Sequence, residues 1–213
     1  MYKIGYIDED KGWSNTFYQY FKEEFDIVLI DISSETTIES IISDIKKNEL
    51  DAVIIDFRLD ESGMVNFNGD AIAESLMKIN PHFPIMMLTS YEQDAIDHVE
   101  DVNIINAKDI LDGEKPEKVD VLKAKIHSNI NNYYTKIRKS ENRIEELNEK
   151  KNDGTIEPAE EEELVKLYMY IDEVYPDDKR IPANLIQPGA ITKLDEFVSQ
   201  TKEILKQLKK KKD

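Results

Sequence analysis

Short apolar runs alternate with amphipathic stretches over the first half of the chain. The clearest run is Ala-Val-Ile-Ile at 52–55, which ends abruptly on the carboxylate of Asp56. Short runs rich in β-branched residues predict strands that are buried on both faces of a parallel sheet. Five such strands are expected, at residues 3–7, 25–32, 51–56, 83–88 and 102–106.

The stretches between these runs carry apolar residues at helical spacing. Ser14 is the expected N-cap of the first helix, which continues to about Glu24, and Thr36 with Glu39 is expected to form the capping box of the second. Two further helices are expected at 69–79 and 93–99. Strands and helices that alternate in this way predict an α/β fold with a doubly wound, five-stranded parallel sheet.

Only helical spacing continues beyond Pro116. One long helix is expected from Pro116 to about Lys151, Pro158 opens another, and a last helix begins near Thr192. The apolar stripes of the first two are Ile130, Tyr133, Ile137, Ser140, Ile144 and Leu147, and Leu164, Leu167, Ile171 and Val174. Antiparallel packing within the chain would cover both stripes, so a helical hairpin or bundle is expected. The heptad spacing of the first stripe leaves a coiled-coil homodimer as the alternative.

These patterns divide the chain into two expected parts. Residues 1–128 form the sheet domain, and residues 129–213 form an all-helical extension. The last helix of the sheet domain is expected to run unbroken into the hairpin, as a rod that would carry the state of the first part to a partner.

Composition limits the setting of the protein. The 213 residues contain no cysteine, no apolar stretch close to 18 residues long, and no signal-peptide pattern at the N-terminus. We therefore expect a cytoplasmic protein without disulfides, thiolate metal sites or a membrane span.

The charge of the chain is distributed unevenly. Residues 1–114 contain 25 acidic and 8 basic residues, whereas the remainder contains 20 of each, so the net charge of −17 belongs to the first part. Such a surface repels nucleic-acid phosphates, and a specific nucleic-acid partner is not expected.

Polar side chains stand at the ends of four predicted strands. Asp8 and Glu9 follow the first strand, Asp56 ends the third, Thr89 follows the fourth and Lys108 comes shortly after the fifth. Ligands of open α/β sheets bind beyond the carboxyl ends of the strands, and neighbouring strands lie about 4.8 Å apart. We therefore expect the five side chains to share one crevice.

Three carboxylates this close to one another need a counter-cation. An all-oxygen set without histidine or cysteine favours Mg²⁺. The cation and Lys108 would neutralise a phosphoryl group on Asp56, and Thr89 would donate a hydrogen bond to it.

The five positions, in this order and in these elements, resemble the receiver domains of two-component response regulators. The resemblance covers Met1 to about Asn131 and implies the flavodoxin-like strand order 2-1-3-4-5. It implies that Asp56 is the phospho-acceptor, that Thr89 is the switch hydroxyl and that Lys108 is the invariant lysine.

The same resemblance implies the magnesium ligands. Asp8 and Glu9 correspond to the acidic pair that holds Mg²⁺, with Asp56 and the backbone carbonyl of Arg58 completing the set.

Five features depart from the receiver pattern. The loop at 57–68 is longer than usual, with Asp60 where proline is usual, and Ser90 replaces a small apolar residue. Asp109 stands where proline is usual, and Ile105 occupies the place of the switch aromatic. The phosphorylation chemistry is expected to be retained, while the coupling to output is expected to be unusual.

The resulting interpretation is a response regulator that accepts a phosphoryl group from a histidine kinase or phosphotransfer protein. Its only chemistry would be its own Mg²⁺-dependent phosphorylation and dephosphorylation, so it is not expected to be an enzyme acting on other substrates. Its output would be contact with a downstream protein through the helical extension.

Two other interpretations remain. The altered loop and Ile105 favour a receiver-like scaffold that works without phosphorylation. Asp8-Glu9-Asp10 after an apolar strand resembles the nucleophile motif of haloacid-dehalogenase-type phosphatases, with Leu88-Thr89-Ser90 as the second motif. In that case Asp8, rather than Asp56, would take the phosphoryl group.

Overall fold

Five strands form one parallel sheet in the computed structural model, which describes residues 1–113 and 115–176. Their order is β2-β1-β3-β4-β5, as expected for the doubly wound, flavodoxin-like class. The strands are β1 (Tyr2–Ile7), β2 (Phe25–Ile30), β3 (Ala52–Ile55), β4 (Ile85–Thr89) and β5 (Ile105–Ala107).

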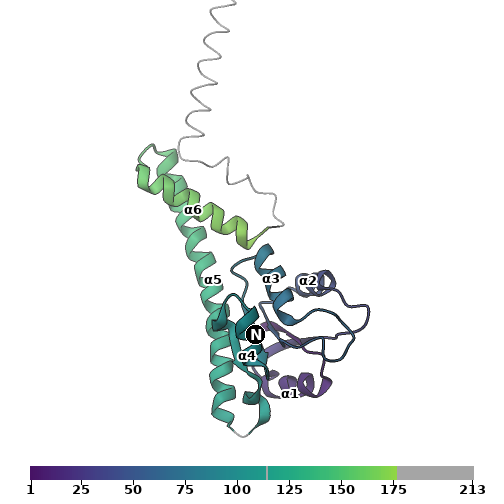
Figure 1. Cartoon of the computed structure of the whole chain (residues 1–213). Helices are drawn as coiled ribbons and strands as arrows, with labels where there is room; N and C mark the ends of the chain where they lie inside the picture. The colour runs from purple at the N-terminus through teal and green to yellow at the C-terminus, as the bar shows by residue number, and fades with distance from the viewer. Residues whose placement is uncertain (114, 177–213) are drawn as a thin grey trace, which may run out of the picture. The chain divides into compact units, whose positions relative to one another are not determined.

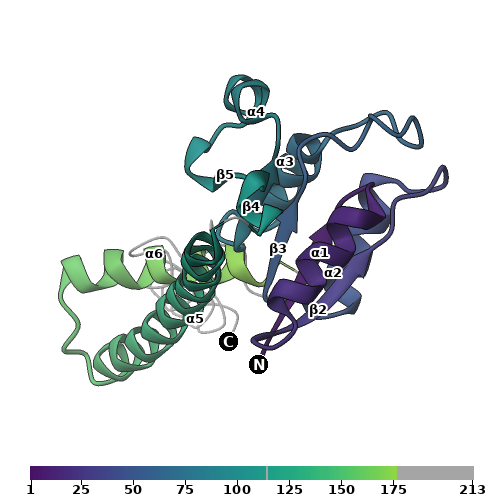
Figure 2. The same ribbon diagram turned by 90° about the horizontal axis from the view of Figure 1, so that it is seen from below.

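Helices connect the strands and cover both faces of the sheet (Figures 1 and 2). They are α1 (Lys11–Phe21), α2 (Ile38–Lys47), α3 (Gly69–Ile79), α4 (Glu92–His98) and the first part of α5 (Pro116–Asn152), with 3₁₀ turns η1 (Val102–Ile104) and η2 (Lys108–Asp112). The rest of α5 leads into α6 (Pro158–Val174). No described helix is both long and apolar enough to cross a membrane.

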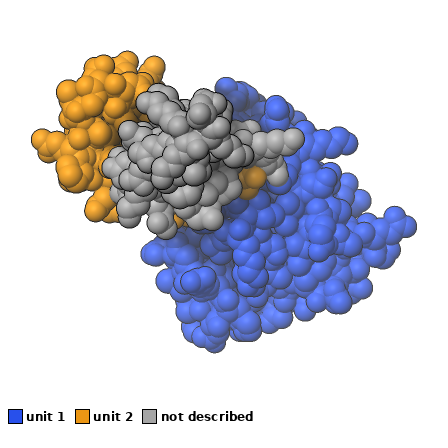
Figure 3. All heavy atoms as spheres, turned by 90° about the horizontal axis from the view of Figure 1, so that it is seen from above, with its two compact units in different colours: residues 1–135 blue, residues 136–213 orange. Residues whose placement is uncertain are grey.

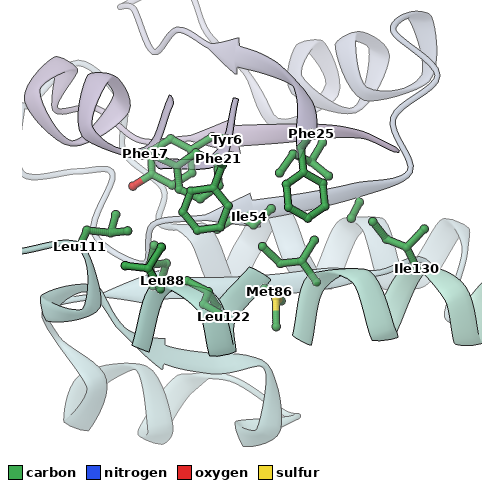
Figure 4. Packing of buried hydrophobic residues seen from close by; sticks show 14 residues of the cluster. Tyr6, Phe17, Phe21, Phe25, Ile54, Met86, Leu88, Leu111, Leu122 and Ile130 are labelled. Carbon is green, nitrogen blue, oxygen red and sulfur yellow. The ribbon is translucent and has the colours of Figure 1, made fainter. Parts of the chain in front are cut away.

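Alternate residues of the central strands enter two different cores, as the two-residue period of a strand requires. Ile54 of β3 packs with α1 and α5, while its neighbour Ile55 packs with α2 and α3. Figure 4 shows the first core, in which the rings of Tyr6, Phe17 and Phe21 stack with centroids 4.1 and 4.2 Å apart. Burial on both faces explains why these strands are continuously apolar in sequence.

Two expected helix caps are wrong. Asp10, not Ser14, caps α1, because its carboxylate accepts hydrogen bonds from the backbone N–H groups of Gly12 and Trp13. The capping box of α2 joins Thr37 with Ser40 instead of Thr36 with Glu39. In each case another side chain that can accept a hydrogen bond from a backbone N–H is the cap. The path of the incoming chain decides which side chain reaches the free N–H groups at the start of the helix.

The fifth strand is shorter than expected. Residues 102–104 form the turn η1 instead of strand, and only Ile105–Ala107 pairs with β4. The side chain of Asp101 caps this turn by accepting from the backbone N–H of Asn103, which commits the first residues to a turn.

The chain divides into two compact units, residues 1–135 and 136–213, with the boundary inside α5 (Figure 3). In the second unit, the second half of α5 and α6 form the expected antiparallel hairpin. Arg143 binds Glu163 through two hydrogen bonds of 3.0 and 2.9 Å, and nearer the turn Lys150 pairs with Glu160. The helix expected from Thr192 lies outside the described residues.

Candidate functional site

The carboxyl ends of β1, β3 and β5 bring three buried charges together. Asp8 follows β1, Asp56 follows β3, and Lys108 begins the turn after β5. The Lys108 ammonium lies 2.8 Å from Asp8 Oδ2 and 3.2 Å from Asp56 Oδ2, and all three residues are less than 5% exposed. One cation is therefore shared between two carboxylates in a site that excludes most water.

Asp8 is held in place by several hydrogen bonds. Its Oδ2 accepts from the Tyr6 hydroxyl at 2.6 Å in addition to Lys108, and its Oδ1 accepts from the backbone N–H of Asp10 at 2.9 Å. Burial and the neighbouring charge of Asp8 raise the pKa of Tyr6, so its hydroxyl stays a donor. Asp8 is thus oriented rather than free.

Asp56 differs from Asp8 in having one oxygen without a partner. Its Oδ1 is buried and has no hydrogen-bond partner among the residues that the structure describes. Burial raises the pKa of Asp56 to about 7, and the negative charges of Asp8 and Glu9 add to that effect, while Lys108 opposes it. The site therefore leaves one electron-rich oxygen available for a ligand or a bond.

Glu9 completes a cluster that could hold a metal ion. One oxygen each from Asp8, Glu9 and Asp56 lie within 4.8 Å of one another. Glu9 Oε2 is buried without a partner among the described residues, and burial raises the pKa of Glu9, as does the charge of Asp8. Oxygens around an octahedral Mg²⁺ lie at most about 4.2 Å apart, so the residues fit this ion after a small contraction.

Gly69 allows α3 to start directly beside Asp56. A Cβ on Gly69 would lie 2.1 Å from the backbone carbonyl oxygen of Asp56 and 2.8 Å from a methyl group of Ile55. The Gly69 N–H also donates to the Phe57 carbonyl at 2.8 Å. Only glycine permits this approach, which fixes the backbone that carries the Asp56 carboxylate.

The other expected site residues have different surroundings. Thr89 is completely buried at the end of β4, and its hydroxyl oxygen accepts from the backbone N–H of Tyr91 at 3.0 Å. The Arg58 side chain points to Asp94 of α4, with a 2.6 Å ion pair. Asp8, Glu9, Asp56 and Lys108 thus form the centre of the site, with Thr89 on the next strand.

Three aromatic neighbours of the site were not expected from the sequence. Tyr6 binds Asp8, Trp13 lies with its ring 5.4 Å from the Lys108 ammonium, and Tyr91 binds Thr89. The two-residue period of a strand places Tyr6 on the same side of the chain as Asp8, and this spacing could have identified Tyr6 from the sequence. The other two depend on tertiary packing.

Comparisons with known proteins find similar solved structures but no similar sequence. No protein-family model and no curated protein matches the sequence. Similar solved structures include one described as adenylate cyclase from Rhodopirellula baltica, with 19% identity over 65% of this chain and 94% of that one (TM-score 0.46).

Receiver domains of response regulators are also among them. A receiver domain of a putative LuxO repressor protein from Vibrio parahaemolyticus is 15% identical over 62% of this chain and 92% of its own (TM-score 0.43). A chain from the complex of the histidine kinase ThkA with the response regulator TrrA is 18% identical over 57% of this chain and 98% of its own length (TM-score 0.41).

Proposed function

We propose that the protein is a response regulator that is phosphorylated on Asp56. The observation that supports this most is the unpartnered, buried Oδ1 of Asp56, which lies next to an ammonium and an oxygen cluster suited to a divalent cation. A carboxylate in this setting is a nucleophile with one cation, Lys108, already beside it.

In the proposed reaction, an Asp56 oxygen attacks the phosphorus of a phosphohistidine on a kinase or phosphotransfer protein. A P–O bond forms and the P–N bond breaks, and the electron pair returns to the imidazole nitrogen, which takes a proton from water. Lys108 stays beside Asp56 and neutralises part of the charge that collects on the phosphoryl oxygens. No further substrate is required, so the protein acts on itself.

A divalent cation bound by Asp8, Glu9 and Asp56 would supply the remaining positive charge. Once formed, the phosphoryl group carries about −1.5 to −2 charges, beside the carboxylates of Asp8 and Glu9 and a single lysine. Asp8 is already oriented by the Tyr6 hydroxyl and the Asp10 N–H, as a metal ligand needs to be. The Arg58 carbonyl is proposed as a further ligand, from the resemblance alone.

The phosphatase interpretation, with Asp8 as the nucleophile, receives less support. Both oxygens of Asp8 already accept hydrogen bonds, and one also pairs with Lys108, whereas Asp56 keeps a free oxygen. Asp56 is therefore the better nucleophile of the two.

The output is proposed to be contact with a downstream protein. The hairpin of α5 and α6 is the element available for this role, and the acidic first part of the chain provides no attraction for nucleic acid. A cytoplasmic location and a homodimer formed through the receiver or an outer helical face also remain proposals.

The test is intact-mass analysis of the full chain with acetyl phosphate and Mg²⁺. One adduct with the mass of a phosphoryl group is expected, which does not form when EDTA replaces Mg²⁺ and is absent in Asp56→Asn. An adduct that persists in Asp56→Asn but disappears in Asp8→Asn would instead support the phosphatase chemistry.

Cation binding can be measured without phosphorylation. Trp13 is the only tryptophan and lies beside Lys108, so its fluorescence should change as Mg²⁺ is added. The change should saturate in the native chain and be lost in Glu9→Gln, while Glu74→Gln on α3 serves as the control that removes an exposed carboxylate.

A further inference from the structure

A group of side chains that the phosphoryl chemistry does not use connects the loop after β3 to α4. Arg58 lies two residues after Asp56, and its guanidinium carbon is 5.3 Å from the centre of the Tyr91 ring and 5.5 Å from that of Phe57. Its Nη2 pairs with Asp94 Oδ2 in the first turn of α4, at 2.6 Å. Arg58 is therefore a single contact point for two segments that flank the site.

Tyr91 is the residue through which this group reaches the site. Its backbone N–H donates to Thr89 Oγ1 and its ring lies against Arg58, while the neighbouring carboxylate of Glu61 in the long loop raises the pKa of the Tyr91 hydroxyl. Tyr91 is also the N-cap residue of α4. Any movement of Tyr91 therefore moves both the hydrogen-bond partner of Thr89 and the start of a helix.

The position of the Thr89 hydroxyl depends on this arrangement. Thr89 is completely buried, and the N–H bond from Tyr91 selects the rotamer in which Oγ1 faces Tyr91. While Arg58 holds the ring of Tyr91, that rotamer is maintained.

A new negative charge on Asp56 would release Tyr91 from Arg58. The Arg58–Asp94 pair is partly exposed, at 32% and 47% of the two side chains, and pairs of this kind are weak in water. A phosphoryl group on Asp56 would carry about −1.5 to −2 charges two residues from Arg58 and would compete with Asp94 for the guanidinium. An arginine that turns toward the phosphoryl group leaves Tyr91 without its cation.

We propose that Arg58 and Tyr91 are positioning residues that hold the Thr89 hydroxyl toward α4 until a phosphoryl group on Asp56 attracts Arg58. Release of Tyr91 then frees Thr89 to turn to the phosphoryl oxygens and loosens the start of α4 in the same event. The inference rests on the proposed function, because it requires a phosphoryl group on Asp56.

Amide hydrogen exchange of residues 91–99 in the full chain tests this, with and without Mg²⁺ and beryllofluoride as the phosphoryl surrogate. In the native chain the surrogate should raise exchange by about three- to tenfold, the range set by one weak ion pair and one cation–π contact. In Arg58→Gln, exchange should be high from the start and change less than about twofold on addition of the surrogate. Arg58→Lys, which keeps a cation over the ring, should restore the native response.

Lys78→Gln is the matched control, since it removes the cation of an exposed ion pair with Glu74 in the same unit. It should leave the native response unchanged. Asp94→Asn is a second, milder variant that leaves Arg58 in place but removes its carboxylate, and it should raise exchange before the surrogate is added. It keeps the test decisive if Arg58→Gln does not fold.

A merely structural role for Arg58 would raise exchange equally with and without the surrogate, and an unchanged ratio in Arg58→Gln and Asp94→Asn would overturn the inference. If the native chain forms neither the phosphoryl adduct nor the surrogate complex, the proposed function fails and the inference fails with it. If the native chain forms both and only the exchange ratio is unchanged, the inference alone fails.

Discussion

At the scale of single residues, the two buried aspartates of the site differ in their hydrogen bonding. Asp8 and Asp56 are both buried and both contact Lys108, yet Asp8 has hydrogen bonds to both oxygens and Asp56 has a free one. Burying a carboxylate whose charge is not fully balanced by hydrogen bonds or cations lowers the stability of the folded state. A role in binding or group transfer explains why such a cost is retained.

The raised pKa of Asp56 predicts how stability depends on pH. Its pKa rises from an ordinary value of 3.8 to about 7, so between these values the folded state holds a proton that the unfolded state has lost. The free energy of unfolding that Asp56 contributes is therefore highest below about pH 4 and falls as the pH rises through 7. Urea unfolding in EDTA should show Asp56→Asn to be more stable than the native chain at pH 8, by about 1 to 3 kcal/mol, with the gain shrinking toward pH 4.

The exposed carboxylate of Asp97 on α4 provides the control. Asp97→Asn should shift stability by a similar small amount at both pH values. An Asp56→Asn chain that is no more stable than the native one at pH 8 would contradict the assignment of Asp56 as the uncompensated charge.

Gly69→Ala should disturb the backbone of Asp56. The new Cβ would overlap the Asp56 carbonyl oxygen, so either α3 or the end of β3 has to move, at a cost of about 2 to 3 kcal/mol. Urea unfolding measures the loss, and intact-mass analysis should show slower phosphorylation by acetyl phosphate.

Gly63→Ala separates this effect from backbone strain. Gly63 has a φ of +68° and nothing within 4 Å of an added Cβ, so the substitution should cost only about 1 kcal/mol and leave phosphorylation unchanged. Equal effects of the two substitutions would argue against a role for the close approach at Gly69.

At the scale of elements, the second half of α5 and α6 stabilise each other as an antiparallel pair. Arg143 and Lys150 lie seven residues apart on α5, with Leu147 between them on the same face and fully buried. Pro158 starts α6, and Glu160 serves both its capping box and the pair with Lys150, which lowers the pKa of Glu160. Packing within the chain therefore uses the stripe that a coiled-coil dimer would need.

Paired spin labels test the hairpin directly. The chain has no cysteine, so Lys139→Cys and Lys166→Cys can carry labels on facing parts of α5 and α6. The labels should lie within roughly 20 Å of each other in one chain, as neighbouring helices require. Leu147→Ala should broaden the distance distribution and lower the stability of the hairpin by about 2 to 4 kcal/mol.

The exposed Glu149→Ala is the control and should leave the distribution narrow. Coupling that appears only between labels on different chains, and vanishes on dilution with unlabelled protein, would favour the coiled-coil homodimer.

At the scale of the whole molecule, charge is the dominant property. The net charge of −17 is carried by the part of the chain that contains the sheet and the site. A field of this sign slows the approach of polyanions and favours partners with a basic surface.

The expected result is that the full chain, phosphorylated or not, selects no sequence from a random duplex library. Mobility shifts at about 0.15 M salt, where charges are screened beyond about 8 Å, provide the measurement. A sequence-selective complex that survives higher salt would overturn the proposed protein–protein output.

The sequence by itself determined the order of elements and the strand ends that carry the polar residues. A continuous apolar run followed by a carboxylate is a local pattern, and parallel strands place their carboxyl ends at one edge whatever the details of packing. The sequence alone therefore groups Asp8, Glu9, Asp56 and Lys108 at one edge of the sheet. The hairpin followed from two apolar stripes and a short connection.

Only the tertiary structure determined which residues cap the helices and which side chains pair. Asp10 and Ser14 can both accept from free N–H groups, and only the entry path of the chain selects Asp10. The free oxygen of Asp56 and the pairing of Arg58 with Asp94, 36 residues away, depend on which side chains arrive from other elements. Periodicity reports the face on which a residue lies, but hydrogen-bond partners depend on distances of a few tenths of an ångström that only the packed chain sets.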